Sequence, residues 1–442
     1  MNILRQSLRK INLRLFSALL VFGLIPTVYT TFRIYLIGQL PGDWGFSIAS
    51  QLQWVNLLYE ILQEALILPL FFFIGAVVHE RTALLNRIKT GLIFTGTVYF
   101  LLSILIFIFA DSLVQFMAQD QTVLLETVHY IRLETIAMMF STLVKFIMVI
   151  LVTLKHERNV YAVLGAQLLL TIIFDVFFVS TLPISLNLGV NGIAITNIIV
   201  NMLLLGVALI LLSYNHLDLR EKNPMNFSWL KQLFLKGGIS GLESLVRNLA
   251  FMLMIVRMVN VVGEQGTFWV ANNFIWGWLL LPVLQLGELV KADCGEEGYE
   301  AVRQKSVGYF GITLIIVIIW GISYPLWTPF MQHVLQLTNY YDIHYIVRIS
   351  VGFYVLFAFN NVVDSIFYGL GKTNYMLFQS LVINIVFYGT AFVLFQAGVF
   401  IPNLTLIALM FAGGTALDSI LTMGMYVWML RRKKIKPLQV RG

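Results

Sequence analysis

The chain has 442 residues, of which 59% are hydrophobic and 12% are charged, and its formal net charge is +7. Soluble domains carry about 25% charged residues, so this composition excludes an ordinary soluble protein and indicates an integral membrane protein. The apolar runs are continuous rather than alternating, which also excludes a transmembrane β-barrel.

Apolar stretches long enough to cross a bilayer recur along the whole chain. A spanning helix needs about 20 apolar residues. We therefore predict an all-α membrane protein with twelve transmembrane helices in two six-helix lobes. The predicted spans are residues 14–38, 50–79, 88–110, 127–153, 159–182, 189–213, 238–262, 268–291, 304–326, 342–368, 374–398 and 404–430.

The basic residues predict the orientation. With the N-terminus in the cytoplasm, the inner segments hold most of the Lys and Arg, and the outer loops hold none. By the positive-inside rule, we expect a multi-pass protein of the cell (inner) membrane with both termini cytoplasmic. This explains the net charge without a nucleic-acid partner. The remaining six basic residues fall inside predicted spans: Arg33, Arg132, Lys145, Arg247, Arg257 and Arg348.

A polar interval at residues 214–237 separates a predicted N-lobe, residues 1–213, from a predicted C-lobe with a basic cytoplasmic tail, residues 238–442. Its Asn223-Pro224 pair ends a helix. The amphipathic run that follows, residues 229–236, fits a segment lying on the cytoplasmic membrane surface. An ordinary solvated loop is the alternative.

The two halves contain similar short stretches. His129-Tyr130-Ile131-Arg132 resembles His344-Tyr345-Ile346-Val347-Arg348, at an offset of 215 residues. Six spans per half place both repeats in the same direction across the membrane. Parallel repeats of this kind are related by a pseudo-twofold axis along the membrane normal, with substrate held between two bundles. Chance similarity between apolar helices is the alternative explanation.

Ionisable residues inside the spans of the first half predict a polar chamber. A charge near the bilayer centre costs at least about 2.5–3.5 kcal/mol, so such residues are expected to be functional. Arg33, Glu134 and Asp175 all lie about 8–10 Å below the predicted outer helix ends. A structural ion pair of Arg33 with Asp175 or Glu134 is the alternative. Three neighbouring polar residues complete the predicted chamber: Thr171, Thr196 and Asn197.

Glu60 and Glu64 lie one turn apart near the middle of the second span. Two like charges at this spacing repel, and desolvation adds to the effect, so one of the two is expected to hold a proton. A protonatable pair at this depth suits a proton-coupled carrier. Alternatively, Lys145 or another cation neutralises the pair structurally.

The second half has polar residues at comparable places. Glu243 and Arg247 are four residues apart on the seventh span, so they can pair along one helix face, and Asn248 is their neighbour. Asn360 and Asp364 share one face of the tenth span. A simple ion pair within the helix is the alternative for Glu243 and Arg247.

Several motifs together resemble one transporter family. The first span carries Pro26 and ends with Arg33-Ile34-Tyr35-Leu36-Ile37-Gly38, and the fifth has Thr171-x-x-x-Asp175. The sixth begins Gly189-Val190-Asn191-Gly192-Ile193-Ala194-Ile195-Thr196, and the seventh begins Lys236-Gly237-Gly238-Ile239-Ser240-Gly241-Leu242. With the twelve-span topology, this pattern resembles the MATE (multidrug and toxic compound extrusion) family of the flippase-like exporter superfamily.

The chain departs from that family at its cation sites. Arg33 replaces the first-helix aspartate, and Asn248 and Asn360 lie near the acidic positions of the second half. The departures argue against sodium coupling through the usual residues. Proton coupling through Glu60, Glu64, Asp175, Glu243 or Asp364 remains open, and the buried cations favour an anionic or zwitterionic substrate.

The resemblance implies a secondary active exporter, a MATE-like antiporter that extrudes small amphipathic organic molecules by alternating access. We expect a monomer surrounded by membrane lipids, with H⁺ or Na⁺ as coupling ion and no other cofactor. An enzyme is not expected, because the sequence contains neither HExxH nor GxSxG. The alternative is a flippase for an anionic lipid or lipid-linked oligosaccharide, in which Arg33, Arg247 and Arg257 contact phosphates.

Overall fold

The computed structural model of the protein describes residues 2–40, 44–154, 156–221 and 225–435. Lys155, Lys222, the Asn223-Pro224 pair and the basic tail from Lys436 onward lie outside these residues. Close contacts group the chain into two units, residues 32–266 and residues 1–31 with 267–442. Each unit is helical, and the described residues contain no strand.

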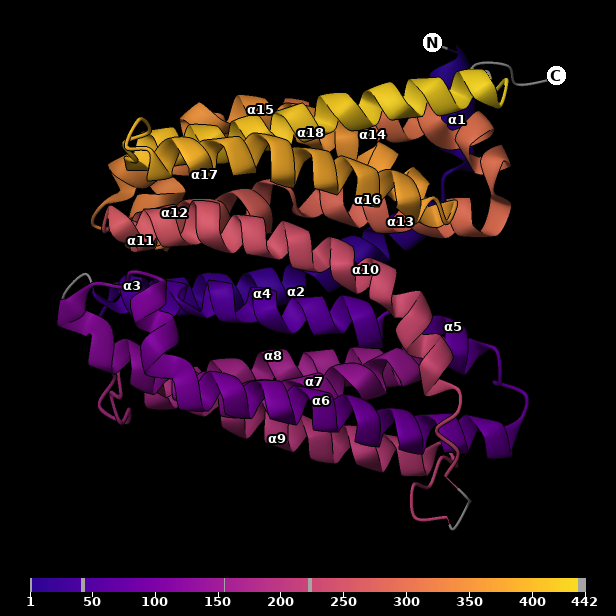
Figure 1. Ribbon diagram of the computed structural model, residues 1–442, viewed down its shortest axis with the longest axis horizontal. Coiled ribbons are helices and arrows are strands. Elements are labelled where there is room, and N and C mark those ends of the chain that lie inside the picture. The colour runs from indigo at the N-terminus through magenta and orange to yellow at the C-terminus, as the bar shows by residue number, and fades with distance from the viewer. Residues whose placement is uncertain (1, 41–43, 155, 222–224, 436–442) are drawn as a thin grey trace. The chain divides into compact units, whose positions relative to one another are not determined.

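The first of these units, residues 32–266, contains the end of α2 and most of the helices of the first half. Helices α6, α7, α8 and α9 lie side by side in it (Figure 1). Its elements are α2 (Leu13–Gly38), α3 (Trp44–Ser50), α4 (Leu52–Leu62), the π-helical turn η1 (Gln63–Ile67), α5 (Leu70–Gly75), α6 (Arg81–Phe116), the 3₁₀ turn η2 (Gln121–Val123), α7 (Leu124–Thr153), α8 (Glu157–Phe178), α9 (Val190–Tyr214), α10 (Leu230–Phe251), the π-helical turn η3 (Met252–Val256) and α11 (Arg257–Val261).

The second unit consists of residues 1–31 and 267–442. Helix α15 contacts α13, α14 and α18 and forms the centre of this unit. Its elements are α1 (Asn2–Lys10), most of α2, α12 (Gln265–Phe274) apart from its first two residues, the π-helical turn η4 (Ile275–Leu279), α13 (Leu281–Glu297), α14 (Tyr299–Pro329), the π-helical turn η5 (Phe330–Val334), α15 (Tyr340–Gly369), α16 (Thr373–Leu381), the π-helical turn η6 (Val382–Tyr388), α17 (Gly389–Gln396) and α18 (Leu404–Arg432).

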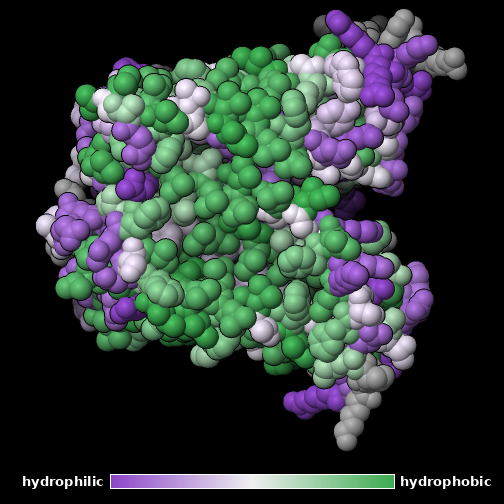
Figure 2. All heavy atoms as spheres, in the orientation of Figure 1, coloured by the Kyte–Doolittle hydropathy of each residue, from purple (hydrophilic) through white to green (hydrophobic). Residues whose placement is uncertain are grey.

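The predicted spans are confirmed in the described part of the chain. Eleven helices are long and apolar enough to cross a membrane, and the pair Gln265–Leu279 and Leu281–Glu297, bent by 52°, makes a twelfth span when it is counted as one. In each unit, hydrophobic residues cover the middle of the helices and hydrophilic residues gather at their ends (Figure 2). The protein is therefore an all-α, multi-pass membrane protein.

The predicted lobes, residues 1–213 and 238–442, remain a prediction. Grouping by contact follows different boundaries, because most of α2 joins the helices of the second half and α10 joins those of the first half.

The amphipathic run at residues 229–236 is helical from Leu230 on rather than a solvated loop, and its place on the membrane surface remains a prediction. Leu230 begins α10, and the run continues directly into the seventh span. The Trp229 side chain is buried and its Nε1 donates to Thr90 Oγ1 of α6 at 2.9 Å. Leu233 is fully buried, and the Lys236 ammonium lies 3.6 Å from the centre of the Phe72 ring. Trp229 thus packs on α6 and Lys236 on α5, whereas Phe234 and Leu235 are exposed.

Buried amide side chains join three segments of the same unit. Gln51 Nε2 donates to Asn260 Oδ1, and Asn260 Nδ2 donates back to Gln51 Oε1, both at 3.0 Å. Gln265 Nε2 donates to Gln119 Oε1 at 2.7 Å, and Gln51 Nε2 also reaches that oxygen at 3.3 Å. Buried polar groups must be hydrogen-bonded to be tolerated, and these four amides supply each other's partners. We call them the amide cluster.

Helix α10 approaches η1 unusually closely, and two glycines allow it. A Cβ at Gly237 would overlap the carbonyl oxygen of Ala65, and a Cβ at Gly241 would lie 2.7 Å from the Ala65 Cβ. Small residues four apart let membrane helices bring their backbones together. The Gly237–Gly241 pair therefore sets the distance between α10 and η1, and with it the position of the polar residues on both.

We expect Gly237→Ala to destabilise the protein by about 1–3 kcal/mol through overpacking against η1. Gly238→Ala is the matched control, because a Cβ there meets nothing within 4 Å and both changes raise helix propensity equally. The measurement is the thermal unfolding midpoint of each purified variant in detergent. Equal midpoints for the two variants would contradict the close approach.

Candidate transport site

The predicted chamber of the first half is assembled around Arg33. Its Nε lies 2.6 Å from Asp175 Oδ2, and its Nη2 donates to Asp175 Oδ1 at 3.3 Å. The Asp175 side chain is completely buried, and that of Arg33 is 14% exposed. A carboxylate this deep requires a charged partner, and Arg33 supplies it with a two-point contact.

Asn197 of α9 connects this pair to the second acidic residue. Arg33 Nη2 donates to Asn197 Oδ1 at 2.7 Å, and Asn197 Nδ2 donates to Glu134 Oε1 at 2.8 Å. Glu134 is also buried, at 1% exposure. One cation, one amide and two carboxylates therefore form a continuous hydrogen-bonded row, Asp175–Arg33–Asn197–Glu134, which runs from α8 through α2 and α9 to α7.

Two predicted threonines lie on the same helices. Thr171 is one turn before Asp175 on α8, and Thr196 precedes Asn197 on α9; both are buried. The structure thus brings Arg33, Glu134, Asp175 and Asn197 into direct contact. This geometry agrees with Arg33 as a structural partner of Asp175. It agrees equally with Arg33 as a member of a polar chamber. A transport role for these residues remains a prediction.

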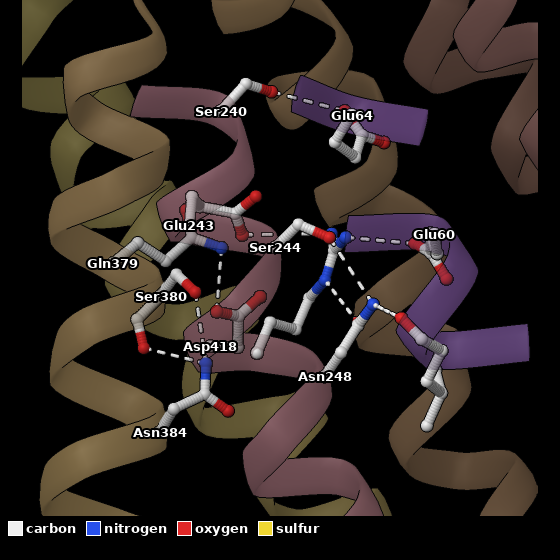
Figure 3. Close-up of polar contacts among 12 residues, drawn as sticks. Glu60, Glu64, Ser240, Glu243, Ser244, Asn248, Gln379, Ser380, Asn384 and Asp418 are labelled. Atoms are coloured by element: carbon white, nitrogen blue, oxygen red, sulfur yellow. Dashed lines mark hydrogen bonds and ion pairs between the residues drawn. The ribbon is translucent and has the colours of Figure 1, made fainter. Parts of the chain in front are cut away.

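A second charged cluster lies between α4 and α10 in the same unit. Arg247 Nη2 lies 3.1 Å from Glu60 Oε1, and its Nη1 lies 3.8 Å from Glu243 Oε1 (Figure 3). Arg247 Nε also donates to Asn248 Oδ1 at 3.4 Å, while Asn248 Nδ2 donates to the Leu57 carbonyl at 3.0 Å. The stronger contact of Arg247 is therefore with another helix, rather than with Glu243 on its own helix.

The cation that pairs with Glu60 is Arg247, and Lys145 is bound elsewhere. Lys145 Nζ donates to Gln63 Oε1 at 3.1 Å. Glu64 accepts a hydrogen bond of 3.2 Å from Ser240 Oγ (Figure 3). Glu64 lies in the π-helical turn η1, and such turns are frequent at functional sites because they displace side chains from the regular helical register.

Glu60 and Lys145 face one small cavity of about 290 Å³. Tyr59 and Thr142 add hydroxyl groups to its wall, and Asn56 adds an amide. Charges of both signs on one cavity suit a zwitterionic molecule better than a simple cation. The sequence analysis named Lys145 as a candidate cation for Glu60 and Glu64, and the structure places it on the same cavity as Glu60.

The predicted polar residues of the tenth span belong to the other unit. Asn360 Nδ2 donates to Asp364 Oδ2 at 2.9 Å, within α15. The neighbouring Asn361 donates to the Val283 carbonyl of α13 at 2.9 Å. In the same unit, Gln379 Nε2 donates to Asp418 Oδ1 at 2.7 Å (Figure 3). Asn361 thus has a structural role in holding α13 against α15.

Sequence reasoning missed one buried ionic cluster in that unit. Lys305 Nζ lies 3.2 Å from Asp293 Oδ1 and 2.7 Å from Glu297 Oε1, and the Tyr309 hydroxyl donates to Asp293. Lys305 lies at the very start of the predicted span 304–326 and was not singled out there. The signal available in the sequence was the spacing of Lys305 and Tyr309, which places both on one face of a helix.

We expect Arg33→Met to lower the free energy of unfolding by about 3–5 kcal/mol, because Asp175 would remain buried without its cation. Lys291→Met is the control. It breaks a pair with Glu288 in which both side chains are exposed, 39% and 53%, and such pairs contribute about 0–1 kcal/mol. The measurement is thermal unfolding in detergent. Similar losses for both variants would show that Arg33 is not held by a buried partner.

The comparisons with known proteins point to one fold. No protein-family model and no curated protein matches the chain. Among solved structures, a multidrug resistance MATE family transporter of the MOP superfamily, described as inward-facing, matches with TM-score 0.72 and 17% identity, covering 92% of this chain and 95% of that chain.

Two further structures match over almost their full length. A MOP superfamily transporter from Pyrococcus furiosus Vc1, described as having a binding pocket of reverse polarity that suggests a different function, matches with TM-score 0.69 and 15% identity over 98% of each chain. The MATE multidrug transporter DinF-BH matches with TM-score 0.65 and 16% identity over 96% of each chain. The protein has the fold of the MATE-family transporters.

Proposed function

We propose that the protein is a secondary active exporter of the MATE type, which moves small amphipathic organic molecules out of the cell by alternating access. The fold and the clusters of ionisable residues within its apolar helices support this function. The single observation that carries it is the buried row Asp175–Arg33–Asn197–Glu134, because charges at this depth are costly and are retained for function.

Protons are the proposed coupling ion. A proton on Asp175 or Glu134 would weaken the hold on Arg33, and a ligand with different affinity for two conformations shifts their balance. A guanidinium already occupies the place where a sodium ion would meet Asp175. Glu60, Glu64, Glu243 and Asp364 are the other proposed proton carriers.

The proposed substrate is anionic or zwitterionic. Arg33 and Arg247 bring fixed positive charge into the helical units, and the cavity at Glu60 and Lys145 offers both signs. The Pyrococcus furiosus transporter, which has the same fold, is described as having a binding pocket of reverse polarity. The protein acts as a monomer in the inner membrane with both termini in the cytoplasm.

A flippase for an anionic lipid or lipid-linked oligosaccharide is the second candidate. The 39% exposure of the Arg247 side chain favours it, because an accessible guanidinium can bind a phosphate with two hydrogen bonds. Arg257 contributes less, since its Nε donates to the Phe116 carbonyl at 2.8 Å.

We expect Asp175→Asn to abolish uptake driven by a pH gradient in reconstituted vesicles, because the amide cannot bind and release a proton. Glu288→Gln, which alters an exposed carboxylate on α13, is expected to transport like the wild type. The assay uses fluorescent dyes of cationic, neutral and anionic charge. Undiminished uptake by Asp175→Asn would remove this residue from coupling, and uptake that follows only a sodium gradient would contradict proton coupling.

A further inference from the structure

An open groove of about 820 Å³ lies between α16 and α18, and it shares no lining residue with the candidate transport site. Its walls are mainly apolar and include Phe378, Ile420, Leu421 and Met425. Gly424 lines the groove, and a Cβ at this position would meet nothing within 4 Å. The groove therefore has room for a flexible hydrocarbon chain.

Aromatic rings and cations gather at one end of the groove. The Tyr375 and Trp428 rings pack edge to face with centroids 6.1 Å apart, and both line the groove. Lys372 lines it as well, and the Arg432 guanidinium lies 5.3 Å from the centre of the Trp428 ring. Trp and Tyr with Lys and Arg are the residues that meet lipid headgroups at a membrane surface.

The charged side chains at this end of the groove are basic. Among the described residues that line the groove, none is acidic. Lys372 is the N-cap residue of α16 and makes no capping bond with its side chain, and a helix start is itself electropositive. Lys372, Arg432 and the start of α16 thus add positive potential at one place, which an anionic group would balance.

We propose that this groove binds one anionic phospholipid, with the phosphate at Lys372 and Arg432 and an acyl chain along Ile420 and Gly424. An apolar groove with basic and aromatic side chains at one end fits a molecule that has a hydrocarbon tail and a negative headgroup. Basic pockets between membrane helices on the cytoplasmic side bind such headgroups, and the predicted orientation places this end of α18 in the cytoplasm. The bound lipid stabilises the pairing of α16 with α18.

The test measures the thermal unfolding midpoint of the purified, delipidated full-length protein against added phosphatidylglycerol. Phosphatidylcholine with the same acyl chains and inorganic phosphate are measured in parallel. We expect phosphatidylglycerol alone to raise the midpoint, because a ligand that binds only the folded state stabilises it. An equal rise with phosphatidylcholine would overturn the preference for an anionic lipid, and a rise with phosphate alone would show a free-anion site instead.

Two pairs of variants locate the site. Lys372→Gln removes one headgroup cation and is expected to weaken lipid binding about fivefold, whereas Lys433→Gln is expected to leave it unchanged. Lys433 is the control because its ammonium lies over the Tyr299 ring and does not line the groove. Equal losses in both variants would mean that lipid responds only to overall surface charge.

Gly424→Leu places a large side chain in the groove without changing any charge. It is expected to abolish the rise of the unfolding midpoint with phosphatidylglycerol. Gly413→Leu is the control on the same helix, since a Cβ at Gly413 also meets nothing within 4 Å but the residue does not line the groove. If both variants fold normally, a full rise of the midpoint with phosphatidylglycerol in Gly424→Leu would overturn the proposal.

Discussion

The ion pair between Arg33 and Asp175 is the constraint on which the first half of the candidate site depends. Removing both charges from water costs several kcal/mol for each ion, and only a well-aligned contact with additional hydrogen bonds offsets that cost. Asn197 provides the additional bonds, because its oxygen accepts from Arg33 and its nitrogen donates to Glu134. The positions of α2, α7, α8 and α9 are therefore tied together through these four side chains.

The cluster at Glu60 and Arg247 depends on backbone geometry instead. Gly237 and Gly241 let α10 reach the π-helical turn that carries Glu64, and Arg247 then reaches Glu60 across the two helices. Bulkier residues at the glycines would separate the helices and lengthen this contact. Packing and electrostatics are thus coupled here: the small residues determine which charges can meet.

The sequence predicted the spans well, because each requires only a long apolar run and basic flanks. It also placed Arg33, Glu134 and Asp175 at one depth, since helix rise converts residue number into depth. The partner of Glu60 was harder to predict. Lys145 and Arg247 were both available, and the choice depends on how α10 rotates and on a π-helical turn that no sequence pattern announced. The contact of Trp229 with Thr90 of α6 could not be predicted either, because an apolar stripe looks the same whether lipid or a neighbouring helix covers it.

The amide cluster differs from both charged clusters in its response to membrane voltage and to pH. Gln51, Gln119, Asn260 and Gln265 hold the start of α4, the connection before α7 and the start of α12 together through neutral groups. Moving a charge through the membrane voltage changes its energy by about 2.3 kcal/mol per 100 mV, but rearranging neutral amides transports no charge. The amide cluster carries no net charge and has no group that titrates near neutral pH. A change in voltage or pH therefore acts on the charged clusters and not directly on the amide cluster.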